Sequence, residues 1–139
     1  MAVIARLRQE HLDAMIAHAQ AEAPLECCGL LARKGEDIVA VHAAANKEAS
    51  PYRFSIDFKE QRRIEGEMDD AGEELGGFYH SHTGSEPRPS PTDIRMMAAF
   101  FGPPYAHFDI GVADRDRPIA RVFFIEEGAA NEHEYEILP

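Results

Sequence analysis

The segment that most restricts how this chain can fold is residues 77–93, GFYHSHTGSEPRPSPTD. Its aromatic start has the length and composition of a β-strand, whereas its middle is too rich in Pro, Gly and Ser to be regular. It ends on a good helix start, with Ser90 at the N-cap, Pro91 at the first helical position and Asp93 facing the positive helix end. A strand, an irregular loop and a helix must therefore follow one another within seventeen residues.

The rest of the chain also predicts helices mixed with strands. Apolar residues recur at helical spacing over about residues 8–21, and Ser55 or Asp57 can cap a second helix that runs to about residue 70. The helix that starts in the segment above extends over about residues 92–101. Strands are predicted for an early hairpin and, with EEGAAN as the turn before the last strand, for the C-terminal part: CCGLLA, IVAVHA, HFDIGVAD, IARVFFIE and HEYEILP.

This order of elements indicates the fold class. Helices mixed with strands, with the strands largely consecutive at the end, favour an α/β or mixed α+β class with a mixed central sheet flanked by about three helices. Gly76 and Gly77 mark the expected break between the second helix and the histidine strand. With 139 residues and 45% hydrophobic residues, the chain has the size and apolar content of one core. We therefore expect residues 1–139 to form a single domain.

The charge balance limits the classes of partner. Twenty-five acidic residues against fourteen Lys and Arg give a formal charge of -11, which repels nucleic acid and anionic lipid membranes. No apolar stretch is long enough to span a bilayer and the N-terminus lacks the apolar region of a signal peptide, so we expect a cytoplasmic protein. The adjacent Cys27 and Cys28 fit a reducing compartment and, in an apolar strand, are expected to be small buried hydrophobes.

His80 and His82 lie two residues apart on the predicted strand, so their rings point to the same face. Asp93, returned by the loop to the start of the helix, can supply a third ligand for a metal held by imidazole and carboxylate, a combination that favours zinc. Three protein ligands leave a fourth position for water. The histidine pair and the Ser-Pro-Thr-Asp helix start each have a simpler explanation when taken alone. Helix caps are abundant, and an isolated His-x-His is more often a packed or exposed pair than a ligand pair.

The two halves together, His-x-His followed after seven residues by Ser and after two more by Asp, resemble the signature of the JAMM, or MPN+, metalloproteases. The resemblance implies a single-domain MPN-like fold and one zinc ion (Zn2+) per chain, held by His80, His82 and Asp93. Members of that family carry a glutamate upstream of the motif, at the start of a strand. Glu26 in PLECCGLL stands in the same context.

For such a site the resemblance implies hydrolysis. Zinc lowers the pKa of its bound water from 15.7 to about 7, Glu26 is the general base for that water, and Ser90 donates a hydrogen bond to the oxyanion of the tetrahedral intermediate. Similar proteins of the short, stand-alone prokaryotic branch cleave peptide or isopeptide bonds after the C-terminal glycines of ubiquitin-like or sulfur-carrier proteins. This chain departs from many members in having Thr83 and Gly84, not proline, after the second histidine, which alters the loop at the substrate rim.

Two other functions stay open at this stage. A non-catalytic MPN-type scaffold would bind a partner without hydrolysis, but its mark is the loss of a zinc ligand, and none is lost here. A RadC-like protein associated with DNA repair carries a similar histidine motif, and the charge of -11 counts against it. His107 and Asp109 alternate on a late strand and can border the site. Residues of this kind are mostly at the surface or behind the ligands, so we do not include them among the candidate site residues.

Overall fold

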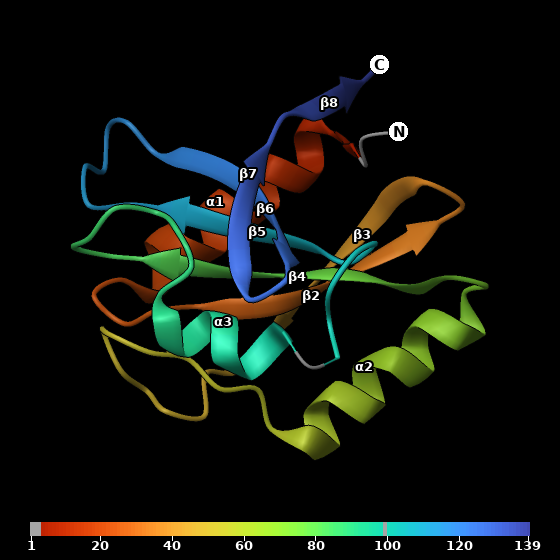
Figure 1. The fold of residues 1–139 in the computed structure, drawn as a ribbon, viewed down its shortest axis with the longest axis horizontal. Coiled ribbons are helices and arrows are strands. Elements are labelled where there is room, and N and C mark those ends of the chain that lie inside the picture. The colour runs from red at the N-terminus through yellow and green to blue at the C-terminus, as the bar shows by residue number, and fades with distance from the viewer. Residues whose placement is uncertain (1–3, 99) are drawn as a thin grey trace.

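The computed structural model describes residues 4–98 and 100–139 and shows a curled mixed β-sheet with three helices packed against it (Figure 1). The predicted mixture of helices with a mixed sheet is confirmed. The elements are β1 (Ala5–Arg8), α1 (Gln9–Glu22), β2 (Cys28–Lys34), β3 (Asp37–Ala44), α2 (Phe58–Asp70), β4 (Glu74–His82), α3 (Pro91–Ala98), β5 (Ala106–Gly111), β6 (Ile119–Glu126), β7 (Ala129–His133) and β8 (Tyr135–Leu138).

Strand β4 lies in the middle of the sheet, because the strands pair in the order β7-β6-β5-β4-β2-β3-β1-β8. It runs antiparallel to β2 and parallel to β5, and its register places His80 beside Cys28 on one side and beside Asp109 on the other. A central strand has its backbone groups paired on both sides. The two histidines are therefore held on a rigid element.

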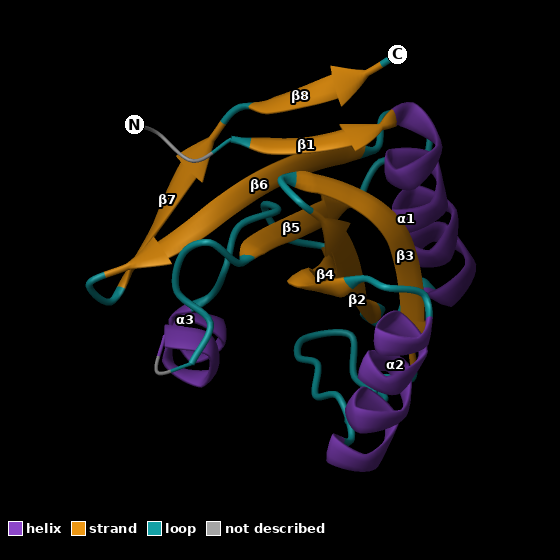
Figure 2. Cartoon of the chain, turned by 90° about the vertical axis from the view of Figure 1, so that its right-hand side faces the viewer, coloured by secondary structure: helices purple, strands orange, loops and turns teal. Residues whose placement is uncertain are grey.

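Two apolar clusters cover opposite faces of β4, because consecutive strand residues point to opposite faces. Tyr79 belongs to the cluster that includes α1, and Phe78 belongs to the cluster that includes α2 and α3. In Figure 1, α1 lies behind the central strands and α3 lies in front of them. Figure 2 shows α2 and α3 on one side of the curled sheet, away from β1 and β8. His80 and His82 share the face of Phe78, so they face the side of α2 and α3.

The early part of the chain folds as its pattern predicts. The hairpin is formed by β2 and β3, and the first two predicted helices are α1 and α2. Of the two possible caps for α2, Asp57 is the one used, because its side chain accepts hydrogen bonds from the N–H groups of Lys59 and Glu60. None of the helices in the described ranges is long and apolar enough to cross a membrane.

The prediction that Gly76 and Gly77 break the chain before the histidine strand is wrong. Strand β4 already begins at Glu74 and includes both glycines. Gly77 serves the sheet instead, because a Cβ atom at this position would collide with the backbone of Ala106 in the adjacent β5. Glycine is therefore the residue that lets β4 and β5 approach closely where Gly77 pairs with Ala106.

The C-terminal strands also differ from the prediction. The segment expected to be one last strand, residues 133–139, contributes to two strands, β7 and β8. The turn before β7 needs only Glu127 and Gly128, both at positive φ, so β7 starts at Ala129 inside the segment expected to be a turn. A tight two-residue turn takes up less chain than the composition of EEGAAN suggests.

Two further boundaries differ from the prediction. Strand β1 was not predicted; it is four residues long and forms because it pairs in parallel with β8 and β3. Helix α3 runs from Pro91 to Ala98, which is shorter than the predicted residues 92–101, and residue 99 lies outside the described residues. The N–H groups of Phe100 and Phe101 still bond the carbonyl of Met97, which closes the end of the helix.

Candidate metal centre and active site

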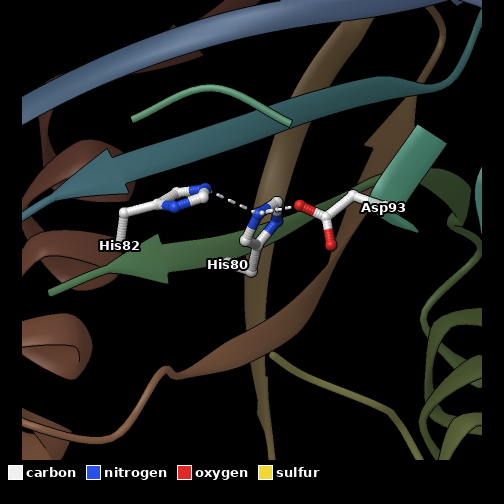
Figure 3. Close-up of side chains that lie close together, drawn as sticks. All are labelled: His80, His82 and Asp93. Carbon is white, nitrogen blue, oxygen red and sulfur yellow. Dashed lines mark hydrogen bonds and ion pairs between the residues drawn. The ribbon is translucent and has the colours of Figure 1, made fainter. Parts of the chain in front are cut away.

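Two histidine rings lie side by side at the end of β4. The Nε2 atoms of His80 and His82 are 3.1 Å apart, and both side chains are buried. The ring of His80 stacks on Phe54, with 4.3 Å between the ring centroids, and the Nδ1 atom of His82 lies 3.1 Å from the hydroxyl of Ser85. The predicted common orientation of the two histidines is confirmed, and both rings meet at one point (Figure 3).

The start of α3 brings Asp93 to this pair. The N–H of Ser90 donates to Oδ2 of Asp93 at 2.9 Å, and the N–H of Asp93 donates to Oγ of Ser90 at 3.1 Å. This is a reciprocal capping arrangement, so the predicted helix cap is confirmed. The same Oδ2 atom of Asp93 lies 3.2 Å from Nε2 of His80 (Figure 3). The cap therefore also orients the carboxylate towards the histidines.

These three side chains have the spacing of a metal site. One ligand atom from each of His80, His82 and Asp93 lies within 4.8 Å of the other two. Tetrahedral coordination with bonds of about 2.0–2.2 Å places the donor atoms about 3.3–3.6 Å apart. The separations of 3.1 Å between the histidines and 3.2 Å between His80 and Asp93 are close to this range. Two imidazoles and a carboxylate are a donor set that suits zinc, so the residues fit the metal.

The charges in this cluster shift the pKa values of its members. Burial alone lowers the pKa of His80, but the attraction of Asp109, Asp93 and Glu26 outweighs burial and raises the pKa to about 9. Burial also disfavours the charged form of Asp93, yet the contacts with His80 and Ser90 outweigh it and lower the pKa of that carboxyl. The carboxylates therefore favour positive charge at this point, which is the charge that a metal ion would bring.

Glu26 lies two residues before the start of β2, on a segment that is hydrogen-bonded to the histidine strand. The N–H of Cys27 donates to the hydroxyl of Ser81 at 2.7 Å, and the N–H of Ser81 donates to the carbonyl of Cys27 at 3.1 Å. The side chain of Glu26 is buried, and burial raises its pKa to about 7 against the opposing attraction of His80 and His82. A carboxyl with such a pKa suits a group that accepts and releases a proton at neutral pH.

The sequence does not select Asp109, yet its carboxylate lies in the same cluster. Its Oδ2 atom is 3.0 Å from Nε2 of His82 and 3.3 Å from Nε2 of His80. It reaches them because β5 pairs in parallel with β4 and places Asp109 opposite His80. An acidic residue within an apolar strand was the available signal, since such residues are rarely buried unless paired. His107, two residues earlier, instead donates from Nε2 to the carbonyl of Phe101 at 2.8 Å.

The loop after His82 is tied to the segment that carries Glu26. The hydroxyl of Thr83 donates to the carbonyl of Pro24 at 3.0 Å. Gly84 is exposed, and its surroundings are open. The threonine at this position thus supplies a hydrogen bond that a proline side chain cannot make.

The two cysteines follow Glu26 directly in the chain, and their thiols are unreactive at neutral pH. Burial raises the pKa of the Cys27 thiol to about 11 and that of the Cys28 thiol to about 12, so both are protonated at neutral pH. Both are buried free thiols. The prediction that they act as small buried hydrophobes is confirmed.

A family profile and two related proteins identify the family of this chain. A profile of prokaryotic homologues of the JAB domain matches residues 8–123. A CysO-cysteine peptidase of Mycobacterium tuberculosis is 36% identical over 129 residues, which cover 91% of this chain and 86% of that protein. A desampylase of Haloferax volcanii is 36% identical over 88 residues, which cover 58% of this chain and 63% of that protein.

Solved structures show the same fold. A protein from Desulfitobacterium hafniense superposes with a TM-score of 0.84 and 31% identity, covering 97% of this chain and 93% of the other. A JAB1/MPN domain protein from Archaeoglobus fulgidus superposes with a TM-score of 0.64 and 16% identity, covering 96% and 99% of the two chains. This chain therefore belongs to the family of prokaryotic homologues of the JAB domain, the prokaryotic branch of the JAMM/MPN proteins.

Proposed function

We propose that this protein is a zinc-dependent hydrolase that cleaves the peptide or isopeptide bond after the C-terminal glycines of a ubiquitin-like or sulfur-carrier protein. The observation that carries this proposal is the convergence of Nε2 of His80, Nε2 of His82 and Oδ2 of Asp93, with the buried Glu26 close enough to interact with the charges of both histidines. Three protein ligands with a nearby carboxyl of raised pKa are the arrangement of a hydrolytic metal site.

His80, His82 and Asp93 hold one zinc ion per chain in this proposal. Ser85 orients the ring of His82 through Nδ1, and the N–H of Ser90 orients the carboxylate of Asp93. Such outer contacts fix the direction of each ligand. A zinc ion held there would supply Lewis-acid chemistry, making a water more acidic at neutral pH and polarising the scissile carbonyl.

Glu26 moves the proton. Burial favours the protonated form of its carboxyl, which suits a group that accepts the proton of the attacking water and later gives that proton to the leaving amine. The Cys27–Ser81 hydrogen bonds hold the segment that carries Glu26 against β4.

Ser90 stabilises the transition state. Its Oγ already accepts the N–H of Asp93, so the hydroxyl proton remains to donate to the oxyanion that forms on the substrate carbonyl. Capping the helix and binding the oxyanion therefore use different parts of one hydroxyl group.

The substrate class comes from the relatives. The printed names of two of them specify a peptidase for a CysO-cysteine conjugate and a desampylase. We infer that the natural substrate of this chain is likewise a small carrier protein with an extended tail, attached to cysteine or to another chain. The formal charge of -11 is unfavourable for a nucleic-acid substrate. The adjacent free thiols Cys27 and Cys28 support a reducing, cytoplasmic location.

A cleavage assay tests this function. The purified protein is incubated with a ubiquitin-like carrier whose Gly-Gly tail is extended by cysteine or by a short peptide, and the carrier mass is followed. We expect release of the extension at the second glycine, and loss of that release with His82→Ala. His42→Ala is the matched control, because His42 lies on β3 and contacts Glu67 at 3.8 Å, not the cluster. No cleavage of any such carrier by zinc-loaded protein would contradict the proposal.

A further inference from the structure

The roles proposed above do not use Asp109, although its charged side chain is fully buried at the centre of the sheet. Its Oδ1 atom has no hydrogen-bond partner within the described residues. Its Oδ2 atom faces Nε2 of His82 at 3.0 Å and Nε2 of His80 at 3.3 Å. A buried carboxylate with so few partners needs a positive charge beside it.

Metal binding by the histidines would remove the present contacts of Asp109. The Nε2 atoms are the ones that face each other and Asp93, so they are the atoms that would bind the metal. An imidazole nitrogen that binds a metal has no proton left to donate. Oδ2 of Asp109 would then lie beside two nitrogens that no longer donate, and Oδ1 offers no compensation. A cation bound by these nitrogens would balance the charge of Asp109.

The distances between Asp109 and the two histidines also fit a shared cation. The contacts of Asp109 with the two histidines, 3.0 and 3.3 Å, match the 3.2 Å contact of Asp93 with His80. All are close to the separation of about 3.3–3.6 Å between donors of a tetrahedral metal. The two carboxylates come from different elements, α3 and β5, and both reach Nε2 of His80.

We propose that Asp109 is a further protein donor to the metal of this site, beside His80, His82 and Asp93. This inference rests on the proposed zinc centre and extends it, because the chain then supplies four donors where the sequence predicts three. Two carboxylates bind a divalent cation more tightly than one. For hydrolysis, such a site would still have to admit a water, with Asp109 as one of the donors beside it.

Zinc affinity, measured by competition with a chelator, tests the role of Asp109. Asp109→Asn keeps the shape of the side chain and removes its charge. Asp116→Asn is the matched control, because it removes the same charge from an exposed position. We expect Asp109→Asn to weaken zinc binding by more than the roughly 10–100-fold that loss of an outer contact costs, and Asp116→Asn to leave it unchanged. A smaller loss, or equal or tighter binding by Asp109→Asn, would show that Asp109 is not a zinc donor and would overturn the proposal.

A second measurement does not depend on whether the variant folds. In a crystal structure of the zinc-loaded wild-type protein, we expect an oxygen of Asp109 at about 2.0–2.2 Å from the zinc. A water between Asp109 and the zinc would overturn this inference and leave the zinc centre intact. A wild-type protein that binds no zinc would instead overturn the proposed function.

Discussion

Strand β4 buries four consecutive side chains, from Tyr79 to His82, but its two faces meet different surroundings. On one face, Tyr79 packs in the apolar cluster of α1, and Ser81 accepts the N–H of Cys27. On the other face, His80 and His82 meet carboxylates from α3 and β5. All four side chains are between 0% and 6% exposed, so burial does not distinguish the two faces. The nature of the partners distinguishes them.

The difference shows how one strand serves both stability and chemistry. The first face satisfies its polar atoms with neutral hydrogen bonds and leaves no charge to be balanced. The second face gathers ionisable groups around one point, where a metal ion is the natural counter-charge. Substitutions on the first face should therefore act on stability, and substitutions on the second face should act on metal binding and catalysis.

The largest expected effects separate the two faces of β4 at the neighbouring residues His80 and Tyr79. We expect His80→Gln to weaken zinc binding by more than the roughly 10–100-fold that loss of an outer contact costs, and to abolish hydrolysis. Tyr79→Ala should instead lower the free energy of unfolding by about 3–5 kcal/mol, because it leaves a large cavity. Zinc affinity and urea unfolding measured on both variants check this. A Tyr79→Ala protein that folds normally but binds no zinc would break the comparison.

The next effect concerns the base on the catalytic face. Glu26→Gln cannot accept a proton, so we expect kcat to fall by about 10²–10⁴-fold while zinc affinity changes little. Single-turnover cleavage of the extended carrier measures this fall. Glu48→Gln is the control, because Glu48 is exposed and lies outside the cluster. Unchanged turnover in Glu26→Gln would assign the proton transfer to another group.

Ser90 tests whether the cap and the oxyanion role are separate. Ser90→Ala and Ser90→Gly both remove the hydroxyl, so we expect each to lower kcat by about 10²–10³-fold. Only alanine should cost about 1 kcal/mol of stability, because glycine is tolerated at helix N-caps. If the loss of turnover follows the loss of stability across the two variants, the serine acts through the helix cap alone.

The smallest effect is a pH dependence of stability in the metal-free protein. Burial raises the pKa of Glu26 from 4.5 to about 7 on folding, so the folded form holds this proton more tightly. Its contribution to stability is complete below pH 4.5 and is lost as the pH rises through 7, an effect of at most about 3 kcal/mol. His80 changes in the same direction only above its ordinary pKa of 6.5. The lowered pKa values of His18 and His107 act in the opposite direction below pH 6.5, equally in wild type and variant. Between pH 4.5 and 6.5, the stability of Glu26→Gln relative to wild type should therefore rise with pH, and a difference that stays constant would contradict this.

Much of the fold was predictable because its elements follow local patterns. The two long helices and the β2–β3 hairpin have clear periodicity and turn residues, and they form where expected. Strands β1 and β7 were missed because they are short and form only through pairing. Strand β1 pairs with β8 at the other end of the chain, and β7 pairs with the preceding β6. The glycines of β4 predicted a break in the chain. Glycine is needed at position 77 because the backbone of Ala106, far away in the sequence, leaves no room for a side chain.

The candidate site divides in the same way. The spacing of His80, His82 and Asp93 is local, so the sequence could group them before the structure did. Asp109 could not be grouped with them, because its place depends on the parallel register of β5 against β4. The zinc itself and the roles of Glu26 and Ser90 stay predictions that the experiments above address.

The central claim is that the second face of β4 is a zinc centre. Calorimetric titration of the metal-free protein with zinc tests it most directly, with wild type, His82→Ala and the control His42→Ala compared. The account predicts one tightly bound zinc per chain for wild type and His42→Ala, and none for a folded His82→Ala. A folded wild-type protein that takes up no zinc, or equal binding by His82→Ala, would contradict it.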